Sequence, residues 1–343
     1  MTRDSSLYAY ASCRLCPRLC RVDRLSGEKG WCGESAALRI ASASLHRGEE
    51  PPLTGGAGSG AVFVTGCNLG CRFCQNAQIS RGGLGRAVPA AEFAEICREL
   101  ERRGAANINL VTGSHAVPAI AEGLRAAREA GLALPVLWNS SAYEPAETLA
   151  LLDGGRPESR LADVWLPDLK TLDSGLARRY FAAPDYPETA AAAIRFMMDR
   201  APLEWAGRPF ESALRRGVMI RHLILPGALD STRAVLRWFA ENAQGRALLS
   251  LMTQYTPVAK NAPRLPAIPG RYLSEEENAA ALAMLDEFRI DDGFVQDLAP
   301  DDEWLPDFTE ENPFGSALSV PVWHWKTGIV QPHTARLGRY PSP

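Results

Sequence analysis

The sequence lacks any long hydrophobic run. No stretch of its 343 residues approaches the roughly 20 consecutive apolar residues that a membrane-spanning helix needs. The first residues, Met1 to Ser6, contain no apolar region of the kind found in secretory signals. We therefore expect a cytoplasmic protein with no membrane partner.

An excess of charge of one sign is also missing. The chain has 37 Lys and Arg residues against 40 Asp and Glu residues, a formal net charge of -3. This balance excludes a polyelectrolyte, so we expect no nucleic-acid partner. Internal repeats and low-complexity tracts are absent apart from the glycine-rich joint Gly55 to Gly60, and the apolar content of 46% is enough for a substantial core.

Cysteine is scarce through most of the chain and concentrated near its start. Seven of the eight cysteines fall in two tight clusters within the first 74 residues. In a chain without a secretory signal, such clusters indicate metal binding rather than disulfides. The eighth, Cys97, has helical spacing with Phe93, Ile96 and Leu100, which predicts a core position.

Three cysteines follow directly after the apolar run Ala61 to Val64. The segment TGCNLGCRFCQN places Cys67, Cys71 and Cys74 within eight positions. A 4Fe-4S cluster normally takes four cysteine ligands, so three would leave one iron open to a small molecule. A zinc knuckle usually spaces its ligands in pairs and closes with four, which favours the iron-sulfur cluster.

The spacing Cys-x3-Cys-x-Phe-Cys resembles the signature of the radical S-adenosylmethionine (SAM) enzymes. The following Gln75-Asn76 resembles the cluster loop of the pyruvate formate-lyase activating enzymes and of relatives with an extra cysteine-rich N-terminus. The resemblance, which covers about residues 10 to 308, implies a 4Fe-4S cluster on the three cysteines and SAM on its open iron. It also implies that Phe73 and Asn76 lie beside the cofactor.

Short β-rich runs alternate with amphipathic helical runs from residue 61 onward, a pattern typical of a parallel α/β sheet or barrel. We expect strands at 61–65, 108–112, 135–139, 164–169, 218–225 and 248–255, and helices that include 90–103, 118–130 and 231–243. Six βα units are too few for an eight-stranded barrel. We therefore expect an α/β fold, a partial (β/α)6 barrel, which the resemblance also implies, with a lateral opening for a large substrate.

Two further segments flank this barrel. We expect a cysteine-rich metal-binding segment at 1–55, the radical SAM barrel at 56–300 and a tail at 301–343 that either covers the open side of the barrel or docks on it. The polar run His46 to Pro51 has a counterpart in the extended relatives. Its Glu49 and Glu50 either approach the cluster or cap the glycine-rich joint.

Polar residues gather at the expected carboxyl ends of the strands, where barrels of this kind place their active sites. They are Thr112, Gly113, Ser114, Asn139, Ser140, Asp168, Lys170 and Arg221. The resemblance implies that all of them contact SAM or the substrate. The activating enzymes carry Gly-Gly-Glu where this chain has Thr112-Gly113-Ser114, so the acidic residue is missing here.

The motifs of the fourth and fifth strands are closer to those of the activating enzymes. Asp168-Leu-Lys170 resembles their Asp-Leu-Lys, and the run from Arg221 to Gly227 resembles their strand-five motif. Because side chains alternate along a strand, Arg221 and His222 face opposite sides. We expect Arg221 to point into the barrel.

Cys13, Cys16, Cys20 and Cys32 form a second, four-thiol set. Four ligands close a site, so its metal would stabilise the N-terminal segment rather than bind a substrate. Zinc and an auxiliary 4Fe-4S cluster both satisfy the spacing.

The resemblance implies reductive cleavage of SAM at the 4Fe-4S cluster to a 5'-deoxyadenosyl radical, which abstracts a hydrogen atom. Activation of a glycyl radical enzyme is one outcome, and modification of another protein or of a small molecule is an alternative. A one-electron donor such as flavodoxin or ferredoxin would be a partner. A non-catalytic iron-sulfur protein that transfers electrons is the competing class, and it would need no SAM pocket.

Overall fold

The computed structural model describes residues 7–54, 58–258, 270–298 and 305–331. Residues 1–6, part of the glycine-rich joint (55–57), the start of the expected tail (301–304) and its end (332–343) lie outside the described residues. In the described part of the chain, no helix combines the length and the apolar character that crossing a membrane requires.

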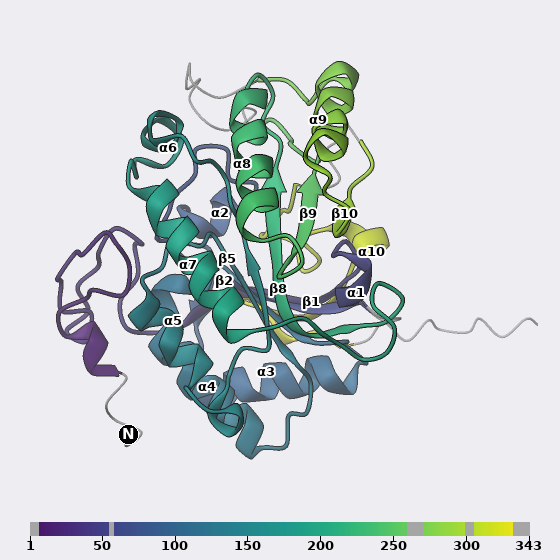
Figure 1. Ribbon diagram of the computed structural model, residues 1–343. Helices are drawn as coiled ribbons and strands as arrows, with labels where there is room; N and C mark the ends of the chain where they lie inside the picture. Colours follow the sequence, from purple (N-terminus) through teal and green to yellow (C-terminus); the bar gives the residue numbers. More distant parts are fainter. Residues whose placement is uncertain (1–6, 55–57, 259–269, 299–304, 332–343) are drawn as a thin grey trace, which may run out of the picture.

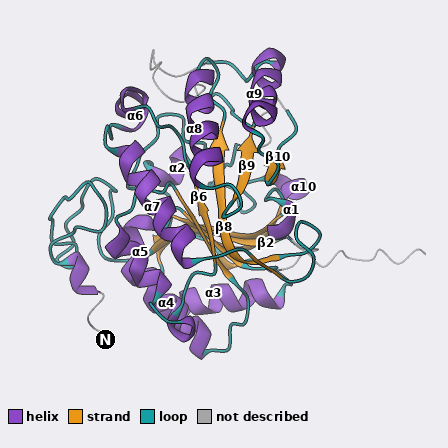
Figure 2. Cartoon of the chain, in the orientation of Figure 1, coloured by secondary structure: helices purple, strands orange, loops and turns teal. Residues whose placement is uncertain are grey.

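A mostly parallel, open β-sheet forms the centre of the molecule (Figure 2). Seven of the described strands run parallel, in the order β10-β9-β8-β6-β5-β4-β2. They are β2 (Ser59–Val64), β4 (Ile108–Val111), β5 (Val136–Ser140), β6 (Val164–Pro167), β8 (Leu214–Leu223), β9 (Leu248–Met252) and β10 (Gly293–Val295). The first six correspond to the six expected strands, so the predicted α/β fold with an unclosed sheet is confirmed.

Strands beyond β2 run antiparallel and extend the sheet on that side. β1 (Arg39–His46) pairs with β2 and with β11 (Ser319–His324), and β11 pairs with β12 (Gly328–Ile329). The short strands β3 (Arg86–Ala87) and β7 (Glu204–Trp205) pair with β1 and β8. One sheet therefore includes strands from both flanking segments.

Helices flank the sheet (Figure 1). The described helices are α1 (Pro51–Thr54), α2 (Ala77–Ser80), α3 (Ala90–Arg102), α4 (Val117–Glu129), α5 (Ala146–Asp153), α6 (Ser174–Phe181), α7 (Tyr186–Arg200), α8 (Leu229–Asn242), α9 (Glu275–Phe288) and α10 (Gly315–Leu318). Short 3-10 turns are Leu7–Tyr10, Ser114–Ala116 and Pro157–Ser159. The expected helices at 90–103, 118–130 and 231–243 correspond to α3, α4 and α8 within one or two residues at each end.

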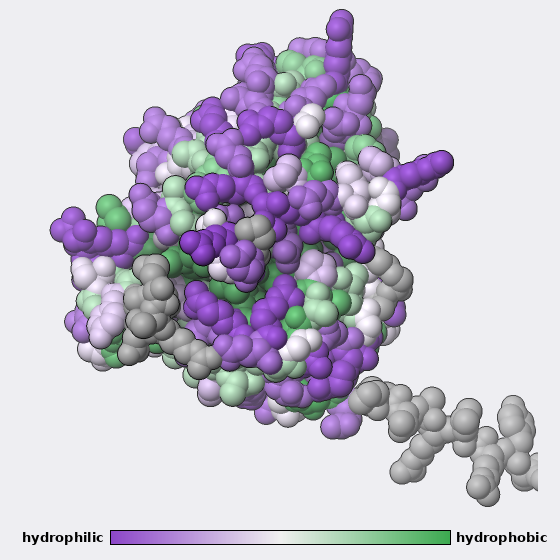
Figure 3. All heavy atoms as spheres, turned by 60° about the horizontal axis from the view of Figure 1, so that its bottom comes forward, coloured by the Kyte–Doolittle hydropathy of each residue, from purple (hydrophilic) through white to green (hydrophobic). Residues whose placement is uncertain are grey.

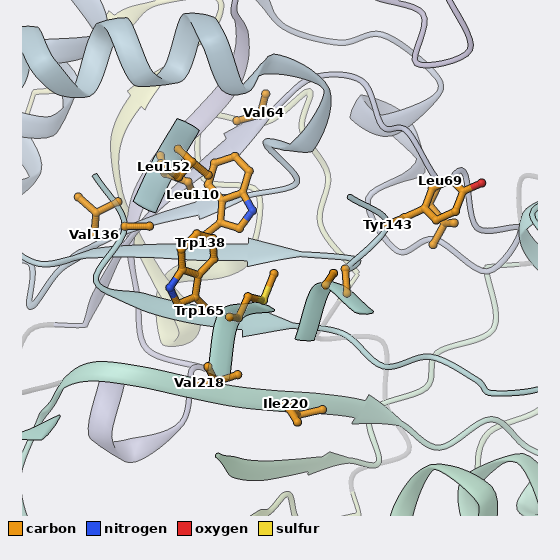
Figure 4. Close-up of a cluster of buried hydrophobic side chains, with 14 of the residues drawn as sticks. Val64, Leu69, Leu110, Val136, Trp138, Tyr143, Leu152, Trp165, Val218 and Ile220 are labelled. Atoms are coloured by element: carbon orange, nitrogen blue, oxygen red, sulfur yellow. The ribbon is translucent and has the colours of Figure 1, made fainter. Parts of the chain in front are cut away.

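The core is continuous across the parallel strands. Val64, Leu110, Trp138, Trp165 and Val218 come from five neighbouring strands and belong to one buried cluster (Figure 4). Strands buried on both faces are typical of parallel sheets covered by helices. Cys97 is fully buried in the same cluster, as its helical spacing predicts.

The two ends of the parallel strands form opposite faces of the molecule. Figure 3 shows the face at the amino-terminal ends, where hydrophilic side chains surround a hollow. Residues that precede the strands, among them Asn107, Pro135 and Asp163, line a cavity there. The cavity at the other face, at the carboxyl ends of the strands, contains the residues that the motifs single out.

Candidate functional site

One cavity at the carboxyl ends of the parallel strands collects side chains from six of them. Cys67 follows β2, Thr112 follows β4, and Asn139 and Ser140 end β5. The rest of its polar and cysteine lining includes Cys71, Cys74, Gln75, Asn76, Ser141, Asp168, Lys170, Arg221, Gln254, Thr256, His46 and Glu49. The strand ends therefore bring most of the predicted residues together at one site.

The cysteine loop forms one wall of this cavity. Backbone N–H groups two residues downstream face two of its sulfurs: Leu69 N lies 3.4 Å from Cys67 Sγ, and the N–H of Asn76 faces Cys74. Burial raises the pKa of Cys71 and Cys74 above the usual value of a thiol. Amide donors aimed at sulfur suit a thiolate bound to metal, because they stabilise its negative charge.

Phe73 anchors the loop in the core. Its ring packs edge-on against Tyr180 and Phe181, at centroid distances of 5.7 and 5.9 Å, and it also contacts Tyr255. Phe73 is buried but still lines the cavity. The aromatic packing thus fixes the backbone between Cys71 and Cys74.

Asp168 and Lys170 form an ion pair inside the cavity, with Lys170 Nζ 2.6 Å from Asp168 Oδ2. Burial opposes the charge of Lys170, but Asp168 outweighs it and raises the pKa of the ammonium. The hydroxyl of Tyr186 donates to the carbonyl of Asp168 at 2.6 Å and accepts the N–H of Lys170 at 3.0 Å. This residue of α7 therefore holds the loop that presents both charges.

Arg221 lies between two carboxylates from the segment after β1. Its Nη2 is 3.1 Å from Glu49 Oε2, and its Nε is 3.1 Å from Glu50 Oε1. Asn109 donates to the other oxygen of Glu49 at 2.9 Å. The side chains of Arg221, Glu49 and Glu50 are only 12%, 7% and 8% exposed. Glu49 and Glu50 thus reach the strand ends, and Glu49 faces the cavity.

His222 points away from the cavity. Its Nδ1 donates to the carbonyl of Leu169 at 2.7 Å, and its Nε2 accepts from the hydroxyl of Thr232 at 3.0 Å. The carbonyl only accepts, so the proton lies on Nδ1. Burial lowers the pKa of His222 to about 4, and the residue is a neutral structural histidine.

Of the three residues after β4, only Thr112 lines the cavity. Thr112 adopts a positive φ of 66°, an unfavourable conformation for a residue with a branched side chain. Gly113 packs against Trp138, where an added Cβ would lie 2.6 Å from the indole. Ser114 bonds the buried carboxyl of Glu144. The structure therefore does not bring Gly113 and Ser114 to the cavity.

Glu144 ties this turn to the end of β5. Its carboxyl oxygens accept from Trp138 Nε1 at 2.8 Å and from Ser140 Oγ at 2.7 Å. Burial raises the pKa of Glu144. Ser140, predicted as a cavity residue, is thus oriented by a carboxyl group that lies behind it.

Several buried polar atoms on the cavity wall make no hydrogen bond to any described residue. They include His46 Nδ1 and Ser141 Oγ, whereas Glu49 Oε2 and Arg221 Nε each lie 3.1 Å from a charged partner. Buried polar atoms normally find a partner. The wall therefore fits a ligand that carries both hydrogen-bond donors and acceptors.

His46, Glu49 and Gln254 line the cavity although the predicted set of cofactor-binding residues does not include them. Glu49 and His46 come from the segment after β1, which the sequence places with the N-terminal appendage. Gln254 follows β9 and accepts, through its backbone oxygen, a hydrogen bond from Gln75 at 2.9 Å. The signal for Glu49 is its place in the polar run His46 to Pro51, and the structure agrees with the alternative in which this run approaches the cysteine loop.

The four N-terminal cysteines also come together. Backbone bonds join Cys13 N to Val22 O at 3.0 Å and Arg21 N to Cys13 O at 2.9 Å, so Cys13 lies against the two residues that follow Cys20. Trp31 N donates to Cys20 Sγ at 3.2 Å, and the N–H of Arg18 faces the sulfur of Cys16.

Burial, together with a smaller contribution from the three other thiols, raises the pKa of Cys16 to about 12. Because all three of these thiols affect the pKa of Cys16, the four sulfurs lie near one another. The same N–H···S pattern as in the Cys67 loop suits metal-bound thiolates. Across the described residues, however, no three His, Cys, Asp or Glu side chains converge closely enough to hold a single metal ion in their present rotamers.

The central part of the chain matches a known family model. Residues 61–201, from β2 to the end of α7, match the family model described as the radical SAM superfamily. An uncharacterised protein of Methanocaldococcus jannaschii is 28% identical over 289 residues, which cover 82% of this chain and 76% of that protein.

Among solved structures, Streptococcus suis SuiB bound to SAM is similar with a TM-score of 0.48 and 14% identity, over 69% of this chain and 52% of SuiB. SuiB bound to its precursor peptide SuiA gives a TM-score of 0.48 and 16% identity, over 67% and 46%. A radical SAM methyltransferase from Sphaerobacter thermophilus gives 0.47 and 17%, over 69% and 66%. This chain spans about half the length of SuiB.

Proposed function

We propose that this chain, with a radical SAM domain over residues 61–201, is an enzyme that cleaves SAM reductively and uses the resulting radical to abstract a hydrogen atom from a substrate. The observation that carries the proposal is the cavity in which Cys67, Cys71 and Cys74 face the Asp168–Lys170 ion pair. An iron-sulfur protein that only transfers electrons needs no such charged pocket next to its cysteines.

Cys67, Cys71 and Cys74 are the proposed ligands of a 4Fe-4S cluster. The donor set fits, because three thiols line one cavity and two of them receive backbone N–H groups. When bound, the cluster supplies one electron and leaves one iron open to SAM. The chain's own part is to hold the loop rigid, through Phe73, and to keep water from the cluster.

The proposed SAM-binding residues present the groups that a zwitterionic nucleoside needs. Lys170 and Arg221 are cations for a carboxylate, and Asp168 and Glu49 are acceptors for an amino group. Thr112, Asn139, Ser140 and Asn76 add polar contacts, and Phe73 adds an apolar surface. Gly113 and Ser114 lie behind Thr112 and support it instead of contacting the ligand.

Cys13, Cys16, Cys20 and Cys32 are proposed to hold a second metal, either zinc or a second 4Fe-4S cluster. Four thiols with aimed N–H donors satisfy the ligand chemistry of both. Metal analysis of a Cys71→Ala variant, which retains only this set intact, distinguishes the two: one zinc, or four irons with sulfide.

Radical chemistry of this kind needs an electron donor and a substrate. A flavodoxin or ferredoxin is the proposed donor, and a glycyl radical enzyme is the first substrate class to test. Incubation with a candidate partner, followed by electron paramagnetic resonance (EPR) of the glycyl radical, checks that class directly. Other proteins and small molecules are the alternatives if no such radical forms.

The test of the function uses the whole chain under anaerobic conditions. The protein is reconstituted with iron and sulfide, reduced with dithionite and mixed with SAM, and 5'-deoxyadenosine is measured by liquid chromatography. Wild type is expected to form it, and Cys71→Ala is expected to form none. Cys97→Ala is the matched control, because Cys97 is buried in the core and does not line the cavity. A loaded and reducible wild-type cluster that gives no product would favour the electron-transfer class.

A further inference from the structure

The four-cysteine segment packs directly against the loop that carries Cys67, Cys71 and Cys74. In Figure 1 this segment lies at one side of the molecule, beyond α5 and α7. Its contacts with the cysteine loop occur on both sides of Cys67. This arrangement links two proposed metal sites that are far apart in the sequence.

The first contact lies before Cys67, at Gly66. The backbone of Gly66 has a φ of 90°, and an added Cβ would lie 2.5 Å from Glu34 Cγ and 3.1 Å from the carbonyl oxygen of Cys32. Glycine is therefore required both by the backbone conformation and by the close approach of the N-terminal segment. The Cys32 turn rests on the residue that precedes the first cluster cysteine.

The second contact lies after Cys67 and is made by Arg18. Its guanidinium donates to the carbonyl of Asn68 at 3.1 Å and to that of Leu69 at 2.9 Å. It also donates to Phe181 at 2.8 Å and to Ala182 at 2.6 Å. One side chain thus joins the residues between Cys67 and Cys71 to the end of α6, whose aromatic residues hold Phe73.

Arg18 is equally well tied to the four-cysteine set. It lies between Cys16 and Cys20, and its own N–H faces the sulfur of Cys16. Its guanidinium lies 4.1 Å from the ring centre of Trp31, whose N–H donates to Cys20. Arg81, which follows the cysteine loop, donates to the Trp31 carbonyl at 2.9 Å.

We infer that Arg18 is a positioning residue that transmits metal occupancy at Cys13, Cys16, Cys20 and Cys32 to the loop of Cys67, Cys71 and Cys74. A metal on Cys16 and Cys20 fixes the backbone of Arg18 from both sides. The fixed guanidinium then holds the carbonyls of Asn68 and Leu69, and with them the spacing of the first two cluster ligands. The inference rests on the proposed 4Fe-4S cluster and adds a dependence of one metal site on the other.

The experiment measures the rate at which a chelator removes iron from the Cys67–Cys74 cluster, and the change in its EPR signal when SAM is added. Arg18→Ala is expected to release iron on the order of tenfold faster, because it removes several charge-assisted hydrogen bonds. Arg18→Lys keeps the charge but cannot bridge two loops, so it is expected to behave like Arg18→Ala. Arg14→Ala removes an exposed arginine of the same segment and is expected to match wild type.

A double-variant comparison tests the transmission itself. Cys20→Ser removes a ligand of the N-terminal set and is expected to speed iron loss from the other loop by a similar factor. If Arg18 is the link, Cys20→Ser combined with Arg18→Ala gives no further acceleration. Circular dichroism of each variant verifies that the chain remains folded. If the N-terminal set also holds iron, the Cys71→Ala variant gives the EPR signal and the iron-release rate of that set alone. These are then subtracted from the values for the whole protein.

Two results would overturn the inference: additive effects in the double variant, or an Arg18→Ala rate equal to that of Arg14→Ala. In either case a stable wild-type cluster that cleaves SAM would leave the proposed function intact. A wild-type chain that binds no cluster at Cys67, Cys71 and Cys74 fails the proposed function instead. The two failures are therefore distinguishable.

Discussion

Glu49 Oε2 lies 3.1 Å from Nη2 of Arg221, so a carboxylate that follows β1 neutralises a cation near the end of β8. Burial raises the pKa of Glu49, and Arg221 opposes that rise. Burial likewise disfavours the charge of Arg221, but Glu50 and Glu49 raise its pKa. Burial therefore disfavours the charges of Glu49 and Arg221, and each of these two groups partly offsets that effect at the other.

Removing the shared cation tests this dependence. Arg221→Met leaves Glu49 and Glu50 without their shared cation and is expected to lower the free energy of unfolding by about 3–5 kcal/mol. Urea unfolding followed by circular dichroism measures the change. Adding Glu49→Gln and Glu50→Gln removes the stranded charges and is expected to recover at least half of the loss. Equal losses in the single and triple variants would mean that packing, not charge, is responsible.

Gly66→Ala tests the close approach next to Cys67. Alanine at a φ of 90° costs about 1–2 kcal/mol from the backbone alone, and its Cβ would also meet Glu34. We expect a larger drop in melting temperature than for Gly27→Ala, and lower iron content. Gly27 has a φ of 94° but no neighbouring atom within 4 Å of an added Cβ. Equal drops in the two variants would show that the close approach of Glu34 to residue 66 does not affect stability.

Tyr186→Phe tests the support of the Asp168–Lys170 loop. The change leaves the N–H of Lys170 without its acceptor and the carbonyl of Asp168 without its donor. We expect the dissociation constant of SAM to rise roughly fivefold to tenfold, from a loss of about 1 kcal/mol. Equilibrium dialysis measures it.

Tyr143→Phe is the control for that change. It removes a hydroxyl that bonds Asp185 at 2.9 Å, and Tyr143 does not line the cavity. Its SAM affinity is expected to equal that of wild type. An unchanged affinity in Tyr186→Phe would mean that the loop keeps its position without the hydroxyl.

We expect the stability of the folded chain to depend on pH through His222. Its folded-state pKa of about 4 lies below the ordinary value of 6.5, so the unfolded chain binds a proton that the folded chain does not. Stability from this group is complete above pH 6.5 and is lost as the pH falls towards 4, by up to about 3 kcal/mol. Denaturant unfolding at several pH values measures the slope.

His222→Gln supplies the comparison, because an amide makes both hydrogen bonds and does not titrate in this range. Its stability is expected to fall less steeply between pH 6.5 and 4 than that of wild type. Other titrating groups and any loss of metal change the stability of both proteins equally. Their effects cancel when the slope of the variant is subtracted from that of wild type. Identical slopes would contradict the assignment of a neutral, buried His222.

The sequence predicted those parts of the fold and site in which local pattern and topology agree. Alternating strands and helices predicted the parallel sheet, and carboxyl-end geometry then grouped Cys67, Asn139, Asp168, Lys170 and Arg221 around one cavity. The positions of these residues follow from the direction of the strands, and the alternation of strands and helices in the sequence predicts that direction.

Contacts between distant segments could not be predicted in the same way. Glu49 reaches Arg221 only because β1 pairs with β2 in antiparallel register. Gly113 and Ser114 turn away from the cavity after Thr112, which adopts a positive φ. Threonine rarely adopts this conformation, so the sequence does not predict it. Pairing partners and backbone twists of this kind are set by tertiary packing.

The pairing of β1 with β11 also has a consequence for synthesis of the chain. Phe314, beside β11, lines the cavity and lies 4.9 Å from the ring centre of His46 on β1. A ribosome completes the described parallel strands before it adds residue 314, so the cavity wall is closed by a segment that emerges after all of them. Until then residues 42–46 of β1 present an unpaired strand edge, which is a site where another chain can add a strand.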